Sequence, residues 1–263
     1  HLKECQTLCM IWQHHRLPTV SSTNRWAIEW LRQHNPQGPV LFTTDHQTEG
    51  RGQRNRRWNS EAGRDVCLSV AFHVQDGWKP AEINMRVALA VRETMLKHLP
   101  ASQSPQAVQV KWPNDILIWH AGEHRKVAGI LVENMWRGSQ WAAAVVGVGI
   151  NVDSSRLTRS YPAVSLTEAW NVTVDPATLA RSVGEHLAQR LNAVGNATSE
   201  DYHEALFAQG ETRTFVVHER EWRGRLMEIN EEGLGRFEWE VQPEVADMPP
   251  AEWLPSNEVQ WCW

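Results

Sequence analysis

The chain has 263 residues, of which 41% are hydrophobic and 22% are charged, and its formal net charge is -5. This composition is typical of a folded globular protein and excludes a disordered or collagen-like chain. The net negative charge also argues against a surface that binds nucleic acid or anionic lipid throughout, so any anion site must be local.

The apolar runs and the cysteines indicate where such a protein resides. The longest apolar run, "WAAAVVGVGI", is about half as long as a membrane-spanning helix, so we expect no membrane association. The cysteines are too few and too scattered for a disulfide framework, which favours a reducing cytoplasm. They are Cys5, Cys9, Cys67 and Cys262.

The first half of the chain predicts helices and strands in alternation. "SSTNRWAIEWLRQHN" places capping residues before apolar side chains on one helical face, which predicts a helix that begins near Ser22. The strand-like segments "PVLFTTDHQ" and "DVCLSVAFHV" follow, joined by a loop rich in glycine and arginine; the second alternates apolar residues on one face. Apolar residues then recur every four positions over 83–99, which predicts an amphipathic helix.

The second half predicts a sheet, further helices and a separate β region. Four β-rich segments ("VQVKWP", "DILIWH", "KVAGILVENMW" and "QWAAAVVGVGINV") are separated by short polar turns and indicate a mixed or antiparallel sheet. A mainly helical stretch follows, and short strands with a glycine-containing turn begin after residue 210. We therefore expect an α+β protein with two domains, residues 1–209 and 210–263.

The loop "EGRGQRNRRWNS" carries an unusual density of positive charge. Its two glycines permit close backbone approaches, and its four arginines are planar donors suited to carboxylate and phosphate oxygens. The alternative is a solvated hairpin tip, but like charges so close together repel one another, which favours an anion clamp. The spacing does not match a P-loop.

Three further stretches are ambiguous when each is considered alone. Asn114 and Asp115 in "VKWPNDILI" suit a base edge, a ribose or a metal, but they also suit a simple turn. Lys126 is either a solvated strand end or an inward cation for a developing oxyanion, and strict alternation places it on the face opposite Gly129. "VVGVGINV" lacks the third glycine of a dinucleotide fingerprint, and Asn151 suits either adenine or the backbone.

The order and wording of these motifs resemble the biotin protein ligases. "SSTN", "DHQTEGRGQRNRRW", "VKWPNDILI", "RKVAGILVEN" and "GVGINV" occur in sequence, and the resemblance spans the chain from about residue 12 to its end. It implies a class II synthetase-like catalytic domain, with a central mixed sheet flanked by helices, and a C-terminal SH3-like β-barrel. It also implies two steps: biotin and MgATP form biotinyl-5′-AMP, and a lysine of a biotin carboxyl carrier protein then accepts the biotin.

The resemblance also implies roles for individual positions. It makes Lys126 and Arg51 the catalytic residues and Asp115 the candidate ligand of Mg²⁺. Contacts to biotin are expected from Ser22, Thr23, Asn24, Gln47, Gly50, Arg51, Gly52, Gln53, Lys126 and Gly129. Contacts to the nucleotide are expected from Arg51, Arg54, Arg56, Trp58, Trp112, Asn114, Asp115 and Asn151.

The chain departs from the commonest wording of the family at two loop positions. Gln53 stands where arginine is frequent, and Asn55 stands where glycine is frequent; asparagine tolerates left-handed backbone angles. Only about twenty residues precede "SSTN", so we expect no DNA-binding domain and no repression of transcription. The resemblance allows a monomer or a homodimer. The alternatives are a lipoate or octanoate ligase of the same fold and a protein whose loop binds nucleic-acid phosphates.

Overall fold

The computed structural model describes residues 13–155, 157, 162–192, 197–240 and 250–262, and its main feature is a seven-stranded mixed sheet. Strands β1 and β2 pair in parallel, and the other neighbours pair antiparallel. The predicted mixed sheet is confirmed, although its first strand was not predicted. In spatial order the strands are β1 (Gln13–Leu17), β2 (Val40–Thr44), β3 (Val66–His73), β7 (Gln140–Ile150), β6 (Glu123–Arg137), β5 (Asp115–His120) and β4 (Val108–Lys111).

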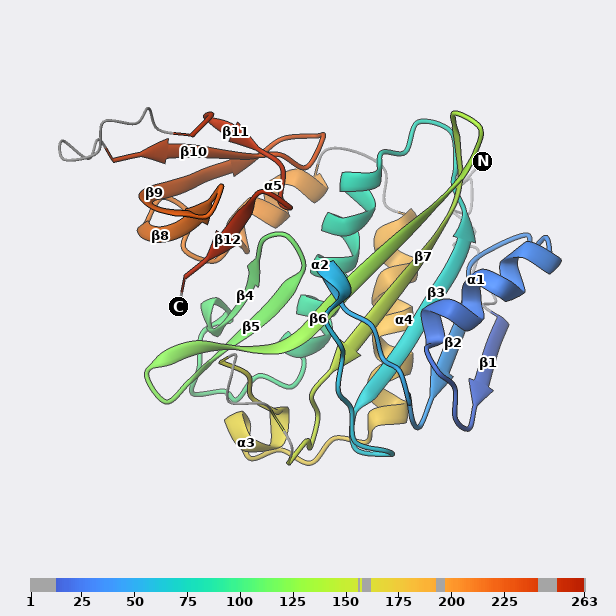
Figure 1. The fold of residues 1–263 in the computed structure, drawn as a ribbon. Helices are drawn as coiled ribbons and strands as arrows, with labels where there is room; N and C mark the ends of the chain where they lie inside the picture. Colours follow the sequence, from blue (N-terminus) through green and yellow to red (C-terminus); the bar gives the residue numbers. More distant parts are fainter. Residues whose placement is uncertain (1–12, 156, 158–161, 193–196, 241–249, 263) are drawn as a thin grey trace, which may run out of the picture.

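Helices cover the two faces of this sheet unequally (Figure 1). Two long helices, α2 (Pro80–Leu96) and α4 (Pro176–Asn192), pack on one face and enclose the larger apolar core. Helix α1 (Thr23–Gln33) covers only part of the other face, where it forms a smaller core with β2, β3 and β7. The remaining helices are short: α3 (Leu166–Trp170), α5 (Ala197–Glu204) and the 3-10 turns η1 (Gln53–Asn55) and η2 (Pro105–Ala107).

Strand β3 lies in the middle of the sheet and is buried on both faces. Val66, Leu68 and Val70 belong to the larger core, as their alternation predicts. On the opposite face Ala71 is buried in the smaller core with α1, and Cys67 is buried next to Gln47, Trp58 and Ser60. Burial by a second layer of structure is not visible in the alternation of a single strand.

A separate five-stranded antiparallel sheet forms the C-terminal region. It confirms the predicted small β region, and its order is β11 (Trp253–Leu254), β10 (Gly235–Trp239), β9 (Arg220–Ile229), β8 (Thr212–Val217) and β12 (Val259–Trp261). Phe215 packs against Phe237 and Trp261, with ring centroids 5.2 and 4.9 Å apart. The indole of Trp261 also donates a hydrogen bond to the Trp112 carbonyl at 3.1 Å, which ties the two sheets together.

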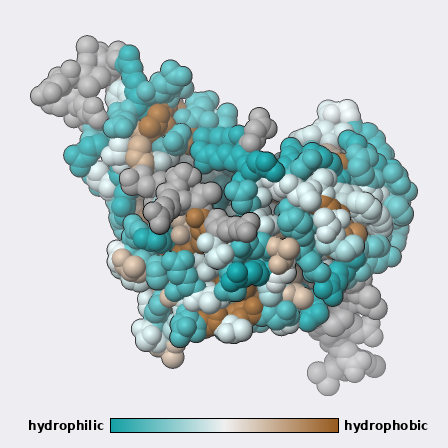
Figure 2. All heavy atoms as spheres, turned by 60° about the horizontal axis from the view of Figure 1, so that its bottom comes forward, coloured by the Kyte–Doolittle hydropathy of each residue, from teal (hydrophilic) through white to brown (hydrophobic). Residues whose placement is uncertain are grey.

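The exterior is mainly hydrophilic on the face that Figure 2 shows, where hydrophobic residues lie in small separate areas. Across the part of the chain that the structure describes, no helix combines the length and the apolar character needed to span a membrane.

Candidate active site

A cavity of about 660 Å³ lies on the α1 side of the sheet, beyond the N-terminus of that helix. Its floor is set by the residues of β7 that face this side. Val145 lies under α1 in the smaller core, whereas the next two residues on that face are Gly147 and Gly149, which line the cavity. A Cβ atom on Gly147 would come within 2.3 Å of Asn24 Oδ1, and one on Gly149 within 2.2 Å of the Trp58 ring. The strand therefore holds the cavity open by the absence of side chains.

The wall beside α1 is a buried network of polar side chains. Ser22 takes an extended backbone conformation and begins the helix, so that Thr23 and Asn24 occupy its first turn. Gln47 Oε1 accepts hydrogen bonds from the Thr23 amide at 2.8 Å and from the Thr23 hydroxyl at 3.1 Å. Ser69 Oγ lies 2.8 Å from Thr23 Oγ1 and 2.5 Å from Asn24 Oδ1. Buried groups that satisfy one another in this way hold fixed orientations, which suits recognition of a polar ligand.

The arginine-rich loop closes on itself above the cavity. The Trp58 amide donates to the Gly50 carbonyl at 2.9 Å, and the Gly52 amide donates to the Arg56 carbonyl at 2.7 Å. A Cβ on Gly50 would lie 2.3 Å from the Trp58 carbonyl oxygen, so this close approach requires glycine. Gly50 thus lies at the base of the loop, outside the residues that line the large cavity, whereas Gly52 and Gln53 line it.

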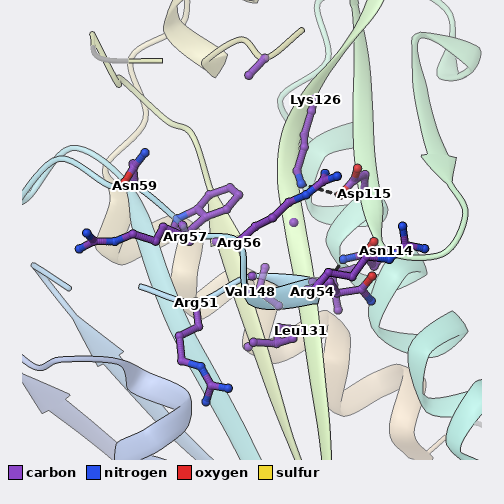
Figure 3. Close-up of a pocket in the computed structure, with 18 of the residues that line it drawn as sticks. Arg51, Arg54, Arg56, Arg57, Asn59, Asn114, Asp115, Lys126, Leu131 and Val148 are labelled. Carbon is purple, nitrogen blue, oxygen red and sulfur yellow. Dashed lines mark hydrogen bonds and ion pairs between the residues drawn. The ribbon is translucent and has the colours of Figure 1, made fainter. Parts of the chain in front are cut away.

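The four arginines of this loop point in different directions (Figure 3). Arg51 pairs with Glu133 at 3.1 Å, and Arg57 donates to the Thr48 carbonyl at 3.1 Å. Arg56 points toward the Lys126 and Asp115 pair. The loop therefore supplies one arginine to the middle of the cavity and uses others in contacts with the protein.

Arg54 connects the loop to the C-terminal sheet. Its guanidinium donates to the carbonyls of Ser256 and Val259, the latter at 3.1 Å. The residue takes a left-handed backbone conformation, with φ 54° and ψ 41°. The sequence indicated Asn55 for such angles, and the structure has them at Arg54, whose side chain is held by these two carbonyls.

Lys126 lines the cavity because of a β-bulge, and so the structure decides the orientation that alternation left open. Asp115 on β5 pairs with Gly129 on β6, and Ile116 pairs with Ala128, but Leu117 pairs with Lys126, so that Val127 is the extra residue. The bulge brings Lys126 to the same face as Gly129. Its ammonium lies 2.5 Å from Asp115 Oδ1 and 5.7 Å from the centroid of the Trp58 ring.

Lys111 is a cavity residue that the sequence analysis missed, although it heads "KWPND". Its side chain is 9% exposed, and its ammonium lies 3.6 Å from Asp115 Oδ2 and 5.6 Å from the Trp261 ring centroid. Burial lowers the pKa of Lys111 to about 8, opposed by Asp115 and assisted by the charges of Lys126 and Arg56. One carboxylate thus lies between two ammonium groups, and the cluster carries an excess of positive charge suited to an anion.

In the "WPND" turn, Asn114 and Asp115 line the cavity, whereas Trp112 does not. The Asn114 amide donates to the Ile130 carbonyl at 2.7 Å, and the Asn151 amide donates to the Val164 carbonyl at 3.4 Å. Both asparagines line the cavity with Asp115. Trp112 was expected to contact the nucleotide, but its ring is buried and packs against Phe237, with centroids 6.1 Å apart. The structure therefore places that ring between the two sheets.

The donors for a metal ion are few. Among the described residues that line the cavity, Asp115 is the one carboxylate. No group of three or more His, Cys, Asp or Glu side chains with metal-site geometry occurs within the described ranges. Because Mg²⁺ is commonly held by one or two carboxylates together with substrate phosphates and water, this donor set fits a Mg²⁺ ion that arrives with a nucleotide.

Comparison with known proteins identifies the family. Residues 17–151, about half of the chain, match the model of the Biotin/lipoate A/B protein ligase family. The chain belongs to this family. The matched segment contains the polar wall, the arginine loop, Lys126 and the glycines of the floor.

Two curated proteins illustrate the sequence similarity within this family. The bifunctional ligase/repressor BirA of Escherichia coli (strain K12) is 32% identical over 168 residues, 62% of this chain and 49% of that protein. A biotin--[acetyl-CoA-carboxylase] ligase of Paracoccus denitrificans is 35% identical over 137 residues, 52% of this chain and 53% of that protein. The chain thus matches about half the length of these curated relatives.

Solved structures of biotin protein ligases confirm the fold. The enzyme from Aquifex aeolicus in complex with biotin and ATP superposes with a TM-score of 0.69 at 19% identity, covering 95% of this chain and 99% of that one. The enzyme from Leishmania major in complex with biotinyl-5-AMP gives a TM-score of 0.61 at 22% identity, covering 86% and 95%. The expected α+β fold, with a mixed sheet and a separate C-terminal β region, is therefore confirmed.

Proposed function

We propose that this protein is a biotin protein ligase, which forms biotinyl-5′-AMP from biotin and ATP and then transfers biotin to a lysine of a biotin carboxyl carrier protein. The observation that carries the proposal is the pairing of two chemistries in one cavity. A buried, neutral polar wall made by Thr23, Asn24 and Gln47 lies at one end, and the cations Lys111, Lys126 and Arg56 lie at the other. The ureido ring of biotin suits the wall, and its carboxylate suits the cations.

Adenylation on this site brings two anions together. A carboxylate oxygen of biotin forms a bond to the α-phosphorus of ATP while the bond from that phosphorus to the pyrophosphate oxygen breaks, and pyrophosphate leaves. No protein nucleophile is needed, so catalysis depends on positioning and on fixed positive charge. The Lys126 ammonium, with Lys111 behind it across Asp115, is held where it can neutralise both partners.

Transfer then consumes the adenylate. The neutral amine of the acceptor lysine forms a bond to the carbonyl carbon of biotin, the bond from that carbon to the phosphate oxygen breaks, AMP leaves, and the amine loses a proton to solvent. The loop closes on itself through the Trp58 amide and the Gly50 carbonyl, so we expect the acceptor to gain access when these contacts open.

Mg²⁺ is the cation that this proposal adds to the protein's own charges. Asp115 and the amide oxygens of Asn114 and Asn151 would hold it beside the nucleotide, since all three residues line the cavity. When bound, Mg²⁺ neutralises phosphate charge. Asp115 would then exchange part of its contact with Lys126 for the metal.

The two alternatives fit the site less well. A lipoyl ring is apolar and offers no hydrogen-bonding groups to the polar wall of Thr23, Asn24 and Gln47, so a ligand with a polar ring fits this wall better. A nucleic-acid arm needs free cations, but Arg51 and Arg54 are engaged by the protein itself. The free thiols Cys67 and Cys262 agree with a cytoplasmic location, which we also propose. The domain boundary at 209/210 remains a prediction.

Exchange of pyrophosphate into ATP tests the proposal. We expect wild-type protein with MgATP to exchange pyrophosphate when biotin is supplied, and not when lipoate is supplied. Lys126→Ala should reduce the exchange by at least ~100-fold, the usual cost of removing one group that stabilises developing charge. Lys97→Ala, at an exposed lysine of the helix-covered face, is the control and should change nothing. Absence of biotin-dependent exchange in the wild type would refute the proposed function.

A further inference from the structure

Glu133 ends the "KVAGILVE" segment and has no role in the function proposed above. It lies on β6, two residues beyond Leu131 and four beyond Gly129, on the face that lines the cavity. Its side chain is 23% exposed, which is low for a carboxylate. A partly buried charge at this position requires partners, and both of its oxygens have one.

Each carboxylate oxygen of Glu133 holds a different part of the cavity. Oε2 accepts a hydrogen bond from the Asn24 amide Nδ2 at 2.8 Å. Oε1 lies 3.1 Å from Nη1 of Arg51. One side chain therefore connects the polar wall beside α1 with the loop that covers the nucleotide end.

The contact with Asn24 fixes the orientation of that amide. Nδ2 is directed to Glu133 and, at 3.3 Å, to the Leu131 carbonyl, so Oδ1 must face Ser69 and Gly147. A carboxylate can only accept hydrogen bonds, and it therefore excludes the flipped amide. The carbonyl oxygen of Asn24 is thereby presented along the floor of the cavity.

The contact with Arg51 has the opposite consequence for the nucleotide. Figure 3 shows the Arg51 side chain directed away from Lys126 and Asp115. Arg51 must exchange Glu133 for phosphate oxygens if it is to act on the nucleotide. Glu133 would then lose its contact with Arg51 and keep only the one with Asn24. Its negative charge would also repel the negative charges of the phosphates across a partly buried space.

We propose that Glu133 is a positioning residue that couples the two ends of the cavity. It orients Asn24 for biotin, and it holds Arg51 away from the phosphates until the nucleotide displaces it. This inference rests on the proposed function. We expect the charge of Glu133 to affect the affinity for the nucleotide and its hydrogen-bond acceptor to affect the affinity for biotin. Two substitutions can separate these effects.

Glu133→Gln removes the charge but keeps an oxygen that can accept from Asn24. We expect the dissociation constant for α,β-methylene-ATP, measured by titration calorimetry with biotin bound, to fall about two- to fivefold, the range for a partly exposed ion pair. The dissociation constant for biotin alone should stay within about twofold. Glu133→Leu removes the acceptor as well, so that biotin should bind about tenfold more weakly, as expected when a buried donor loses its partner.

Glu49→Gln is the matched control, because Glu49 pairs with Arg25 at the same distance of 3.1 Å and lies near the same loop. It should leave both constants within about twofold of the wild-type values. The proposal is overturned if Glu133→Gln binds the nucleotide no more tightly than Glu49→Gln, or if folded Glu133→Leu binds biotin as the wild type does. If Glu133→Leu does not fold, the Gln variant decides alone. Failure of wild-type protein to bind biotin would instead refute the proposed function.

Discussion

The two faces of strand β7 differ in their side chains: one face carries apolar residues of the larger core, and the other carries glycines that line the cavity. On one face Val146 and Ile150 are fully buried in the larger core, which α2 and α4 enclose. On the other face Val145 is followed by Gly147 and Gly149, and the space that side chains would fill belongs to the cavity. The same alternation thus builds a core and a site from adjacent residues, because a glycine on one face does not disturb the packing on the other.

This difference separates stability from binding along a single strand. Changes on the core face should alter the free energy of unfolding and leave the ligand affinities of the folded protein intact. Substitutions of the glycines on the other face should alter the ligand affinities more than the free energy of unfolding. Gly147 and Val146 test this contrast on adjacent residues, and Lys111 and the arginine loop test the groups that surround the glycine face.

The largest effect is expected on the glycine face. In Gly147→Ala the new methyl group would lie 2.3 Å from Asn24 Oδ1, and Asn24 is held by Ser69 and Glu133, so the amide has to leave its network. We expect kcat/KM for biotin in pyrophosphate exchange to fall about a hundredfold, the cost of misplacing a contact by about 1 Å. A loss below about threefold would show that the floor tolerates a side chain.

The neighbouring residue on the core face should behave in the opposite way. Val146 is fully buried, and truncation to alanine removes two methyl groups from the larger core. Val146→Ala should lower the free energy of unfolding by about 2 kcal/mol in denaturant titrations. Its biotin affinity below the transition should equal that of the wild type, and a parallel loss of affinity would contradict the separation of the two faces.

A smaller effect, dependent on pH, is expected at the cationic end of the cavity. Because burial lowers the pKa of Lys111 to about 8, its ammonium loses its proton as the pH rises through that value. The rate of adenylate formation should therefore fall by up to about tenfold per pH unit above pH 8, if the charge is needed. Arginine stays charged throughout, so Lys111→Arg should move this decline to higher pH; an unchanged profile would exclude Lys111 as its cause.

The smallest effect is expected at the loop. Arg54→Ala removes the contacts with Ser256 and Val259, so the closed loop should release biotinyl-5′-AMP about two- to fivefold faster in a stopped-flow chase. Gln53→Arg, which adds a cation to the cavity lining, should slow the release. Arg57→Ala serves as the comparison because Arg57 contacts only Thr48 at the base of the loop among its described hydrogen bonds. Equal release by all three variants would leave the loop without a retaining role.

The sequence predicted most elements of the fold, although not β1, because their signals are local, and the resemblance to the biotin protein ligases named many of the residues that line the cavity. The helix from Thr23, the strand that carries Gly147 and the turn at Asn114 each follow from a periodicity or a turn preference within a few residues. The β-bulge at Val127 could not be predicted, because an extra residue in β6 is defined only by how that strand pairs with β5. For that reason alternation alone could not decide which face Lys126 occupies.

Residues whose role depends on distant partners were also missed. Lys111 acquires its lowered pKa from burial next to the C-terminal sheet, about 150 residues away in the chain. Glu133 meets Asn24 and Arg51 only after the sheet has formed. Gly147 and Gly149 are a local signal, because glycine within a strand often marks a place where a ligand or another segment of the chain approaches the backbone closely.

The central claim is that biotin and ATP react on the glycine face beside Lys126. Its most direct test is mass spectrometry of the small molecules bound after wild-type protein and Lys126→Ala are each incubated with biotin and MgATP. We expect the wild type to retain biotinyl-5′-AMP and Lys126→Ala to hold none of it, or far less. Equal amounts of the adenylate in both proteins, or none in the wild type, would contradict it.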